Sequence, residues 1–191
     1  MPFEKCIYIT TVMSDFNKDW FFAGGWAIDL FLGKETRVHH DIEIGIFRED
    51  QIELKDFLSN REWEFKKVLK GEFTPWNNEY LELPVHEIHA INNAKKFELE
   101  ILLNESDAGN WRFRRDLRIS YPLRSVLSYS ETGLPYLAPE IVLLYKVKNT
   151  REKDHKDFLS VKDILDSKQQ NWLRQAIKIH EPKHDWLQLL D

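Results

Sequence analysis

This chain of 191 residues is poor in cysteine, in long apolar runs and in excess positive charge. Its single cysteine, Cys6, excludes an intramolecular disulfide and a cysteine-based zinc site. No apolar run approaches the roughly 18 residues that a membrane span requires, and the N-terminal stretch MPFEKCIYITTVM lacks the apolar core of a signal peptide. These absences predict a cytoplasmic protein that neither is secreted nor inserts into a membrane.

The charge balance restricts the partners of the protein. A net charge of −5 argues against nucleic acid as a partner, because broad binding to its backbone needs a basic footprint. A local basic pocket for a small anion remains compatible with this charge. The chain is long enough for one domain, or for one domain with a modest extension.

The apolar patterns predict an α/β (α+β) fold, with a small mixed β-sheet, flanking helices and a helical C-terminal part. Strand and helix patterns do not alternate regularly, so a mixed sheet is favoured over a parallel one. We divide the chain into an α/β part over 1–120 and a helical part over 121–191. In chain order we expect a helix over 3–18, a strand near 20–23, a helix ending at Gly33, a strand over 40–47, a helix over 49–61, a strand over 63–69, a loop over 71–84, a hairpin over 85–103, a strand over 111–120, and helices on both sides of a break near residue 150.

Two acids lie close together in the stretch TRVHHDIEIGIF, residues 36–47. In a strand, residues two positions apart share a face and lie about 6.5–7 Å apart. Asp41 and Glu43 could therefore reach one point in space. Magnesium prefers hard oxygen ligands, usually one or two carboxylates together with phosphate oxygens and water. The pair predicts a metal site, and a solvated strand face is the alternative.

A glycine pair precedes these acids. Gly24 and Gly25 lie between a short apolar stretch and a helical pattern. Glycine lets the backbone approach a ligand closely, and a helix N-terminus favours anions. Together with the acids, the pair indicates a phosphate-binding turn, whereas alone it would indicate only a turn.

The stretch GGWAIDLFLGKETRVHHDIEIGI, residues 24–46, resembles the nucleotidyltransferase superfamily, whose folds share the DNA polymerase beta catalytic core. Within it the stretch is most similar to the aminoglycoside and lincosamide nucleotidyltransferases, which follow the pattern GGWA-D-LG--TR-H-D-D. The resemblance implies metal-bound ATP and transfer of a nucleoside monophosphate to an acceptor hydroxyl. It also implies that residues 1–120 form the nucleotidyltransferase core. Glu43 departs from the pattern, because the family usually has Asp at this position.

The resemblance implies a third acid on a later strand, near the acceptor. The candidates are Glu98 and Glu100, which alternate with apolar residues and project to one face of the same strand. We favour Glu100 because it lies deeper in the apolar run, where burial would raise its pKa and suit a general base. The alternative is that both are exposed strand acids.

The later helical stretch supplies candidate phosphate ligands. The spacing of Lys146, Lys153 and Asp157 predicts that they share one helix face. The resemblance marks Lys146 and Lys153 as family-like, and we expect both to bind the triphosphate; a solvated face is the alternative. The basic segment 112–118 could flank an anionic substrate, although a salt-bridged strand face is favoured. We expect His39 to orient the loop before Asp41, and we interpret His40, His86 and His89 as incidental.

These observations predict an enzyme, an adenylyltransferase that uses Mg²⁺ (or Mn²⁺) to transfer AMP from ATP to a hydroxyl of a small molecule. The acceptor could be an antibiotic of the aminoglycoside or lincosamide kind. Asp41, Glu43 and Glu100 would hold metal, and Gly24 and Gly25 would bind the triphosphate. One alternative is a non-catalytic nucleotide-binding protein, which the departure at Glu43 keeps open. Another is a toxin or antitoxin transferase that modifies a macromolecule.

Overall fold

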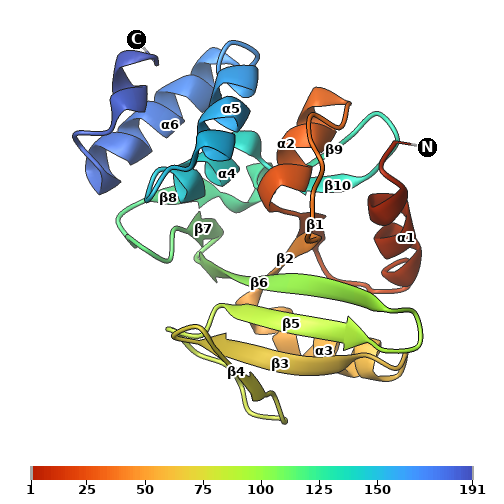
Figure 1. Cartoon of the computed structure of the whole chain (residues 1–191). Helices are drawn as coiled ribbons and strands as arrows, with labels where there is room; N and C mark the ends of the chain where they lie inside the picture. Colours follow the sequence, from red (N-terminus) through yellow and green to blue (C-terminus); the bar gives the residue numbers. More distant parts are fainter. Residues whose placement is uncertain (1, 191) are drawn as a thin grey trace.

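The computed structural model describes residues 2–190 and shows a mixed β-sheet with helices around it (Figure 1). The strands are β1 (Trp20–Phe22), β2 (Glu43–Phe47), β3 (Glu64–Leu69), β4 (Glu72–Pro75), β5 (Glu87–Asn92), β6 (Phe97–Asp107), β7 (Asn110–Arg112), β8 (Ser120–Pro122), β9 (Leu127–Tyr129) and β10 (Pro135–Leu137). The α-helices are α1 (Glu4–Val12), α2 (Gly24–Leu32), α3 (Gln51–Ser59), α4 (Pro139–Lys146), α5 (Glu152–Val161) and α6 (Ser167–His180). The mixed α+β class is confirmed.

The sheet brings segments together that are far apart in the sequence. Its strand order is β4-β3-β5-β6-β2-β1-β10-β9, and β7 pairs with β6 and β8. Strand β2 runs parallel to β6 and β1 runs parallel to β10, whereas the other pairs are antiparallel. Helices α4, α5 and α6 gather on one side of the molecule (Figure 1), and α2 packs against α4 and α5 as well as against β2 and β10. The central strands are thereby covered, so apolar residues such as Phe21, Phe22 and Ile44 are fully buried.

Several local predictions are confirmed. Helix α2 ends at Gly33, which adopts the left-handed conformation that glycine favours at this position (φ 68°). The hairpin of β5 and β6 forms around the Asn-rich turn. Helix α4 begins with Pro139, whose missing N–H needs no partner there, and a break separates it from α5 near residue 150.

Three predicted elements are wrong in extent. The expected loop 71–84 contains β4, which pairs with β3 through a two-residue turn with positive φ at Lys70 and Gly71. All four residues of β4 are exposed, so no alternating pattern marks this edge strand. The helix expected over 3–18 ends at Val12, and the strand expected over 111–120 is broken by a turn into β7 and β8.

The C-terminal part contributes to the sheet as well as to the helices. Strand β10 pairs with β1, with Tyr136 opposite Phe22. The division near residue 120 stays a prediction. Within residues 2–190, the structure has no helix that is both long and apolar enough to cross a membrane.

Candidate active site

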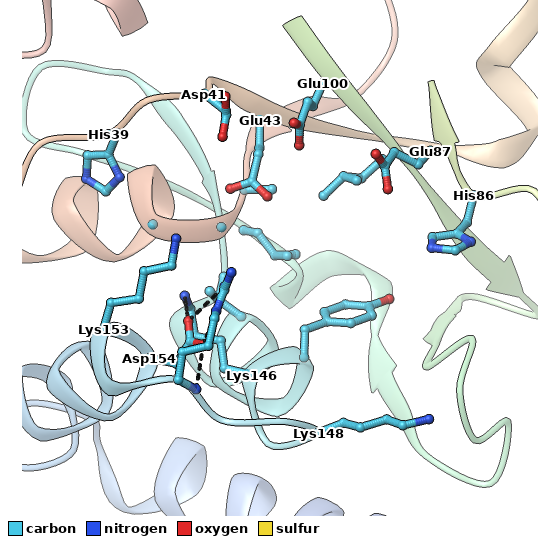
Figure 2. A pocket seen from close by; sticks show the side chains of 18 of the residues that line it. His39, Asp41, Glu43, His86, Glu87, Glu100, Lys146, Lys148, Lys153 and Asp154 are labelled. Carbon is cyan, nitrogen blue, oxygen red and sulfur yellow. Dashed lines mark hydrogen bonds and ion pairs between the residues drawn. The ribbon is translucent and has the colours of Figure 1, made fainter. Parts of the chain in front are cut away.

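A cleft of about 600 Å³ opens between the β2–β6 region of the sheet and helices α4 and α5 (Figure 2). Acidic side chains line its sheet side, and basic side chains approach from the helices (Figure 2). Every predicted site residue lines this cleft: Gly24, Gly25, Asp41, Glu43, Glu100, Lys146 and Lys153. The structure therefore brings together residues from four separate stretches of the sequence.

The register of the sheet determines how the carboxylates meet. Parallel pairing of β2 with β6 places Glu43 directly opposite Glu100, and the Glu100 amide donates to the Ile42 carbonyl at 2.9 Å. Glu98, two residues earlier, is exposed. Asp41 lies in the bend before β2, so the prediction that both acids share a strand face is wrong in detail. The Trp26 indole holds this bend by donating to the Asp41 carbonyl at 2.9 Å.

The charges in the carboxylate centre, which consists of Asp41, Glu43 and Glu100, favour a bound cation. Burial raises the pKa of Glu43, and the charge of Asp41 raises it further, whereas Lys146 and Lys153 oppose this shift. Burial also raises the pKa of Glu100 to about 7, with Glu43 as the next cause. A divalent metal ion would neutralise this accumulated negative charge, and carboxylate oxygens are the ligands that magnesium prefers. Among residues 2–190, the ligand atoms of Asp41, Glu43 and Glu100 do not all lie within 4.8 Å of one another, so these three acids stay predicted metal ligands.

The longer side chain of Glu43 reaches the glycine turn. Gly24 has φ +56°, a conformation that favours glycine, and a Cβ atom there would lie 1.6 Å from Oε2 of Glu43 unless that side chain moved. The backbone of Gly25 hydrogen-bonds the Glu43 carboxylate and opposes the rise of its pKa. In this structure Glu43 therefore binds at the start of α2, where the sequence predicted a triphosphate.

A buried hydrogen-bonded group supports the bend that carries Asp41. Nε2 of His39 lies 2.6 Å from Oδ2 of Asp29, and the Thr36 hydroxyl donates to the other oxygen of this carboxylate at 2.5 Å. The His39 ring also packs on Trp26, with 4.4 Å between centroids. This geometry agrees with the expectation that His39 orients the loop, and it explains why Asp29 is buried.

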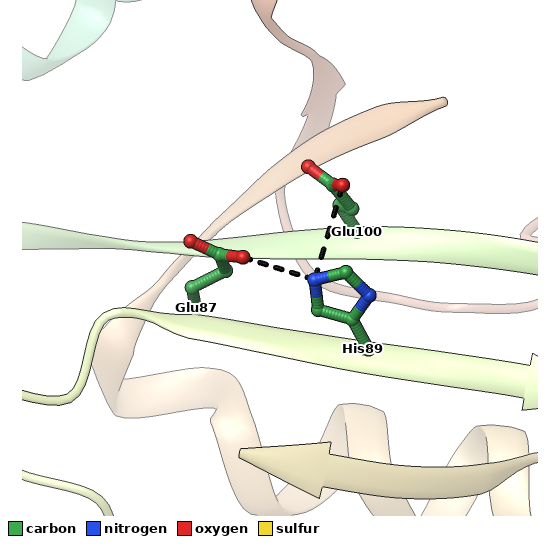
Figure 3. Close-up of side chains that lie close together, drawn as sticks. All are labelled: Glu87, His89 and Glu100. Carbon is green, nitrogen blue, oxygen red and sulfur yellow. Dashed lines mark hydrogen bonds and ion pairs between the residues drawn. The ribbon is translucent and has the colours of Figure 1, made fainter. Parts of the chain in front are cut away.

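His89 lies beside Glu100 and was missed by the interpretation of the sequence. Its Nε2 is 2.9 Å from Oε1 of Glu87 and 3.8 Å from Oε1 of Glu100 (Figure 3). The ligand atoms of these three residues lie within 4.8 Å of one another, so this group could hold a metal ion. The hairpin register, with His89 opposite Glu100, was the available signal.

Ion pairs constrain the lysine predicted to bind phosphate. Nζ of Lys146 lies 2.9 Å from both Asp154 and Asp157, and its side chain is only 9% exposed. Lys153 is exposed and lies on α5, whereas Lys146 ends α4. The prediction of one continuous helix face is therefore wrong, because the chain breaks between the two helices. Both ammonium groups nevertheless lower the pKa of Glu43, so their charge acts on the centre.

We expect Lys146→Ala to destabilise the protein, because it leaves Asp154 and Asp157 buried with fewer cationic partners. Removing one member of a buried ion pair costs about 3 kcal/mol, which corresponds to a fall of roughly 6–12 °C in Tm for a chain of this size. The matched control is Lys153→Ala, which removes an exposed lysine and should change Tm by no more than about 1 °C. Scanning calorimetry of the ligand-free proteins measures both. Equal melting temperatures for the two variants would contradict the structural role of Lys146.

The basic segment 112–118 is partly a salt-bridged surface and partly cleft wall. Arg112 pairs with Asp107 and Arg118 pairs with Asp116. Arg114 and Arg115 instead line the cleft. The expectation of a paired strand face therefore holds only for the ends of this segment, because the turn between β7 and β8 places Arg114 and Arg115 along the wall of the cleft.

The cleft brings together the acids, the glycine turn and the lysines that the sequence predicted for a nucleotidyltransferase. The model of the aminoglycoside-2''-adenylyltransferase family matches residues 6–161. The chain therefore belongs to this family and is a nucleotidyltransferase enzyme. Membership implies a nucleotide substrate and a divalent metal ion.

Relatives support this assignment across most of the chain. A lincosamide resistance protein of Staphylococcus haemolyticus is 22% identical over 163 residues, which cover 84% of this chain and 94% of the relative. The lincomycin-bound crystal structure of the lincosamide antibiotic adenylyltransferase LnuA has a TM-score of 0.59 at 20% identity, covering 85% of this chain and 98% of its own. The crystal structure of ANT(2'')-Ia with adenylyl-2''-tobramycin has a TM-score of 0.56 at 14% identity, covering 97% of this chain and 94% of its own. The two solved structures confirm the fold.

Proposed function

We propose that this enzyme transfers AMP from ATP to a hydroxyl of a small molecule, with Mg²⁺ or Mn²⁺ as the metal. The observation that carries the proposal is the meeting of Asp41, Glu43 and Glu100 in one cleft, next to the glycine turn that starts α2. Family membership favours this enzyme over a non-catalytic nucleotide-binding protein. The cytoplasm is the proposed location.

The residues of the cleft have two proposed binding roles, as metal ligands and as triphosphate ligands. Asp41 and Glu43 are the proposed metal ligands, shared with Glu100. A bound divalent cation would neutralise charge on the phosphate oxygens and orient them for in-line displacement. Gly24, Gly25, Lys146 and Lys153 are the proposed triphosphate ligands, and Glu43 turns away from the Gly25 amide when phosphate binds there.

Glu100 is the proposed general base. Burial and the charge of Glu43 raise the pKa of Glu100 to about 7 in the metal-free protein, and a raised carboxyl pKa suits a general base. The acceptor hydroxyl loses its proton to Glu100, and its oxygen forms a bond to the α-phosphorus. The bond from this phosphorus to the β-phosphate oxygen breaks, and pyrophosphate leaves.

The test is product analysis by mass spectrometry after incubation with ATP and magnesium. We expect an adenylylated small molecule from a panel of hydroxyl compounds that includes lincomycin and tobramycin, and no product when EDTA removes the metal. Labelling of a protein or RNA from the same reaction, with no small-molecule product, would favour a macromolecule-modifying transferase. ATP binding without any transfer would favour the non-catalytic alternative.

A further inference from the structure

Two arginines that line the cleft have no carboxylate within 4 Å in the part of the chain that the structure describes. Arg114 and Arg115 lie in the turn after β7, and within residues 2–190 neither forms an ion pair. Both guanidinium groups approach the ring of Tyr145, with 5.5 Å and 5.4 Å to its centroid. Nη1 of Arg115 donates to the Tyr145 carbonyl at 2.8 Å. The aromatic ring and this carbonyl position two positive charges, and no carboxylate within residues 2–190 forms an ion pair with either of them.

Several other basic residues of the cleft differ from these two arginines. Arg37 pairs with Asp157, Lys146 pairs with Asp154 and Asp157, and Arg151 pairs with Asp154. Their charges are satisfied within the protein. The unpaired charge of Arg114 and Arg115 is therefore available to a ligand.

The nearby acids already have other partners. Glu87 attracts Arg114 electrostatically but accepts from His89 at 2.9 Å. Glu105 also attracts Arg114, yet it is bound by Arg48 through Nε and Nη2 at 2.8 and 2.6 Å. Burial lowers the pKa of Arg114, but a guanidinium stays charged at neutral pH. Such a partly buried cation gains most from an oxyanion that accepts two parallel hydrogen bonds.

The position of the arginines relates them to the acceptor rather than to the triphosphate. Of the four proposed triphosphate ligands, Lys153 lies on the side of the cleft near His39 (Figure 2), and Gly25 lies against the His39 ring. His86, Glu87 and Lys148 lie on the opposite side, beyond Glu100 (Figure 2). The charges of Arg114 and Arg115 both lower the pKa of His86, so the two arginines are close to it. They therefore belong to the half of the cleft that the proposed base faces.

We propose that the acceptor of this enzyme carries a carboxylate or phosphate group, which Arg114 and Arg115 bind while its hydroxyl lies at Glu100. This inference rests on the proposed AMP transfer and names its substrate class. A polycationic aminoglycoside would place like charges against the two guanidinium groups, and such repulsion is an effective means of excluding a ligand. The acceptor gains a phosphodiester bond to AMP and keeps its anionic group, and pyrophosphate leaves as before.

The first experiment measures binding to protein saturated with magnesium and a non-hydrolysable ATP analogue, so that the nucleotide site is filled. Glycerol 3-phosphate and glucuronate are the anionic probes, and glycerol and glucose are their neutral counterparts. We expect calorimetry to detect the anionic probes but not the neutral ones. Arg114→Gln and Arg115→Gln should each weaken binding of the anions at least tenfold. The matched control is Arg118→Gln, which removes a surface arginine of the same segment and should bind as the parent does.

The second experiment measures adenylyl transfer with the same pairs, and with tobramycin and lincomycin. We expect kcat/KM for an anionic acceptor to exceed that for its neutral counterpart at least tenfold, and this preference to disappear in Arg114→Gln. Equal binding of anionic and neutral probes, or faster transfer to tobramycin or lincomycin, would overturn the inference while leaving AMP transfer intact. Loss of affinity for the ATP analogue in the arginine variants would also overturn it, because the arginines would then bind the nucleotide. Failure of the parent to bind the analogue would instead overturn the proposed function.

Discussion

Glu100→Gln should abolish AMP transfer and leave ATP binding largely intact. The substitution keeps the shape of the side chain and removes the proton acceptor that the hydroxyl needs. General bases contribute about 10²–10⁴-fold to rate, so kcat should fall by that factor. A group that acts on the acceptor matters more for turnover than for binding of the nucleotide, so the Kd for ATP should change no more than severalfold. Pyrophosphate release and calorimetry measure the two quantities.

Glu98→Gln is the matched control, because Glu98 lies two residues away on the same strand face and is exposed. It should retain the activity of the parent. An inactive Glu98 variant, or an active Glu100→Gln protein, would contradict the assignment of the base.

The same Glu100 variant should alter stability in a pH-dependent way. The pKa of this carboxyl is raised from 4.5 to about 7 by burial and by Glu43, so between these values the unfolded chain releases a proton that the folded protein keeps. Stability of the metal-free parent should therefore fall as pH rises through this window. Glu100→Gln lacks this loss and should exceed the parent in stability at pH 8 by about 1–3 kcal/mol. Denaturant unfolding at pH 4 and pH 8 measures this, and identical pH profiles would contradict the raised pKa.

Asp41→Ala should remove the dependence of ATP binding on metal. Asp41 lies at the open end of the carboxylate centre, held by the bend before β2. Metal coordination contributes several kcal/mol to stabilising charge in the transition state, and each 1.36 kcal/mol is tenfold in rate. We therefore expect kcat/KM to fall about 1,000-fold. Addition of magnesium should no longer strengthen ATP binding in calorimetry.

Two controls accompany the Asp41 variant. Asp56→Ala removes an exposed acid of α3, away from the cleft, and should behave as the parent. The parent treated with EDTA should resemble Asp41→Ala with magnesium. If the parent binds ATP equally well with and without metal, the proposal that these acids bind metal is wrong.

The sequence by itself determined the elements with strong local signals. The spacing of glycines and acids over residues 24–46 predicted the turn, the helix ending at Gly33 and the candidate metal centre. Apolar alternation with an Asn-rich turn predicted the hairpin of β5 and β6, and depth in the apolar run favoured Glu100. These features depend on residues close together in the chain, where propensity and periodicity act directly. The proposed roles of Asp41, Glu43 and Glu100 stay predictions.

Only the tertiary structure decided which distant residues meet. Parallel pairing of β2 with β6 placed Glu43 opposite Glu100, and no local pattern specifies a partner strand so far away. Because the chain breaks between α4 and α5, Lys146 forms ion pairs with Asp154 and Asp157. The turn after β7 places Arg114 and Arg115 along the cleft. Such contacts form because burying the whole core fixes the relative positions of the elements, which is a collective property that residue spacing along the chain does not encode.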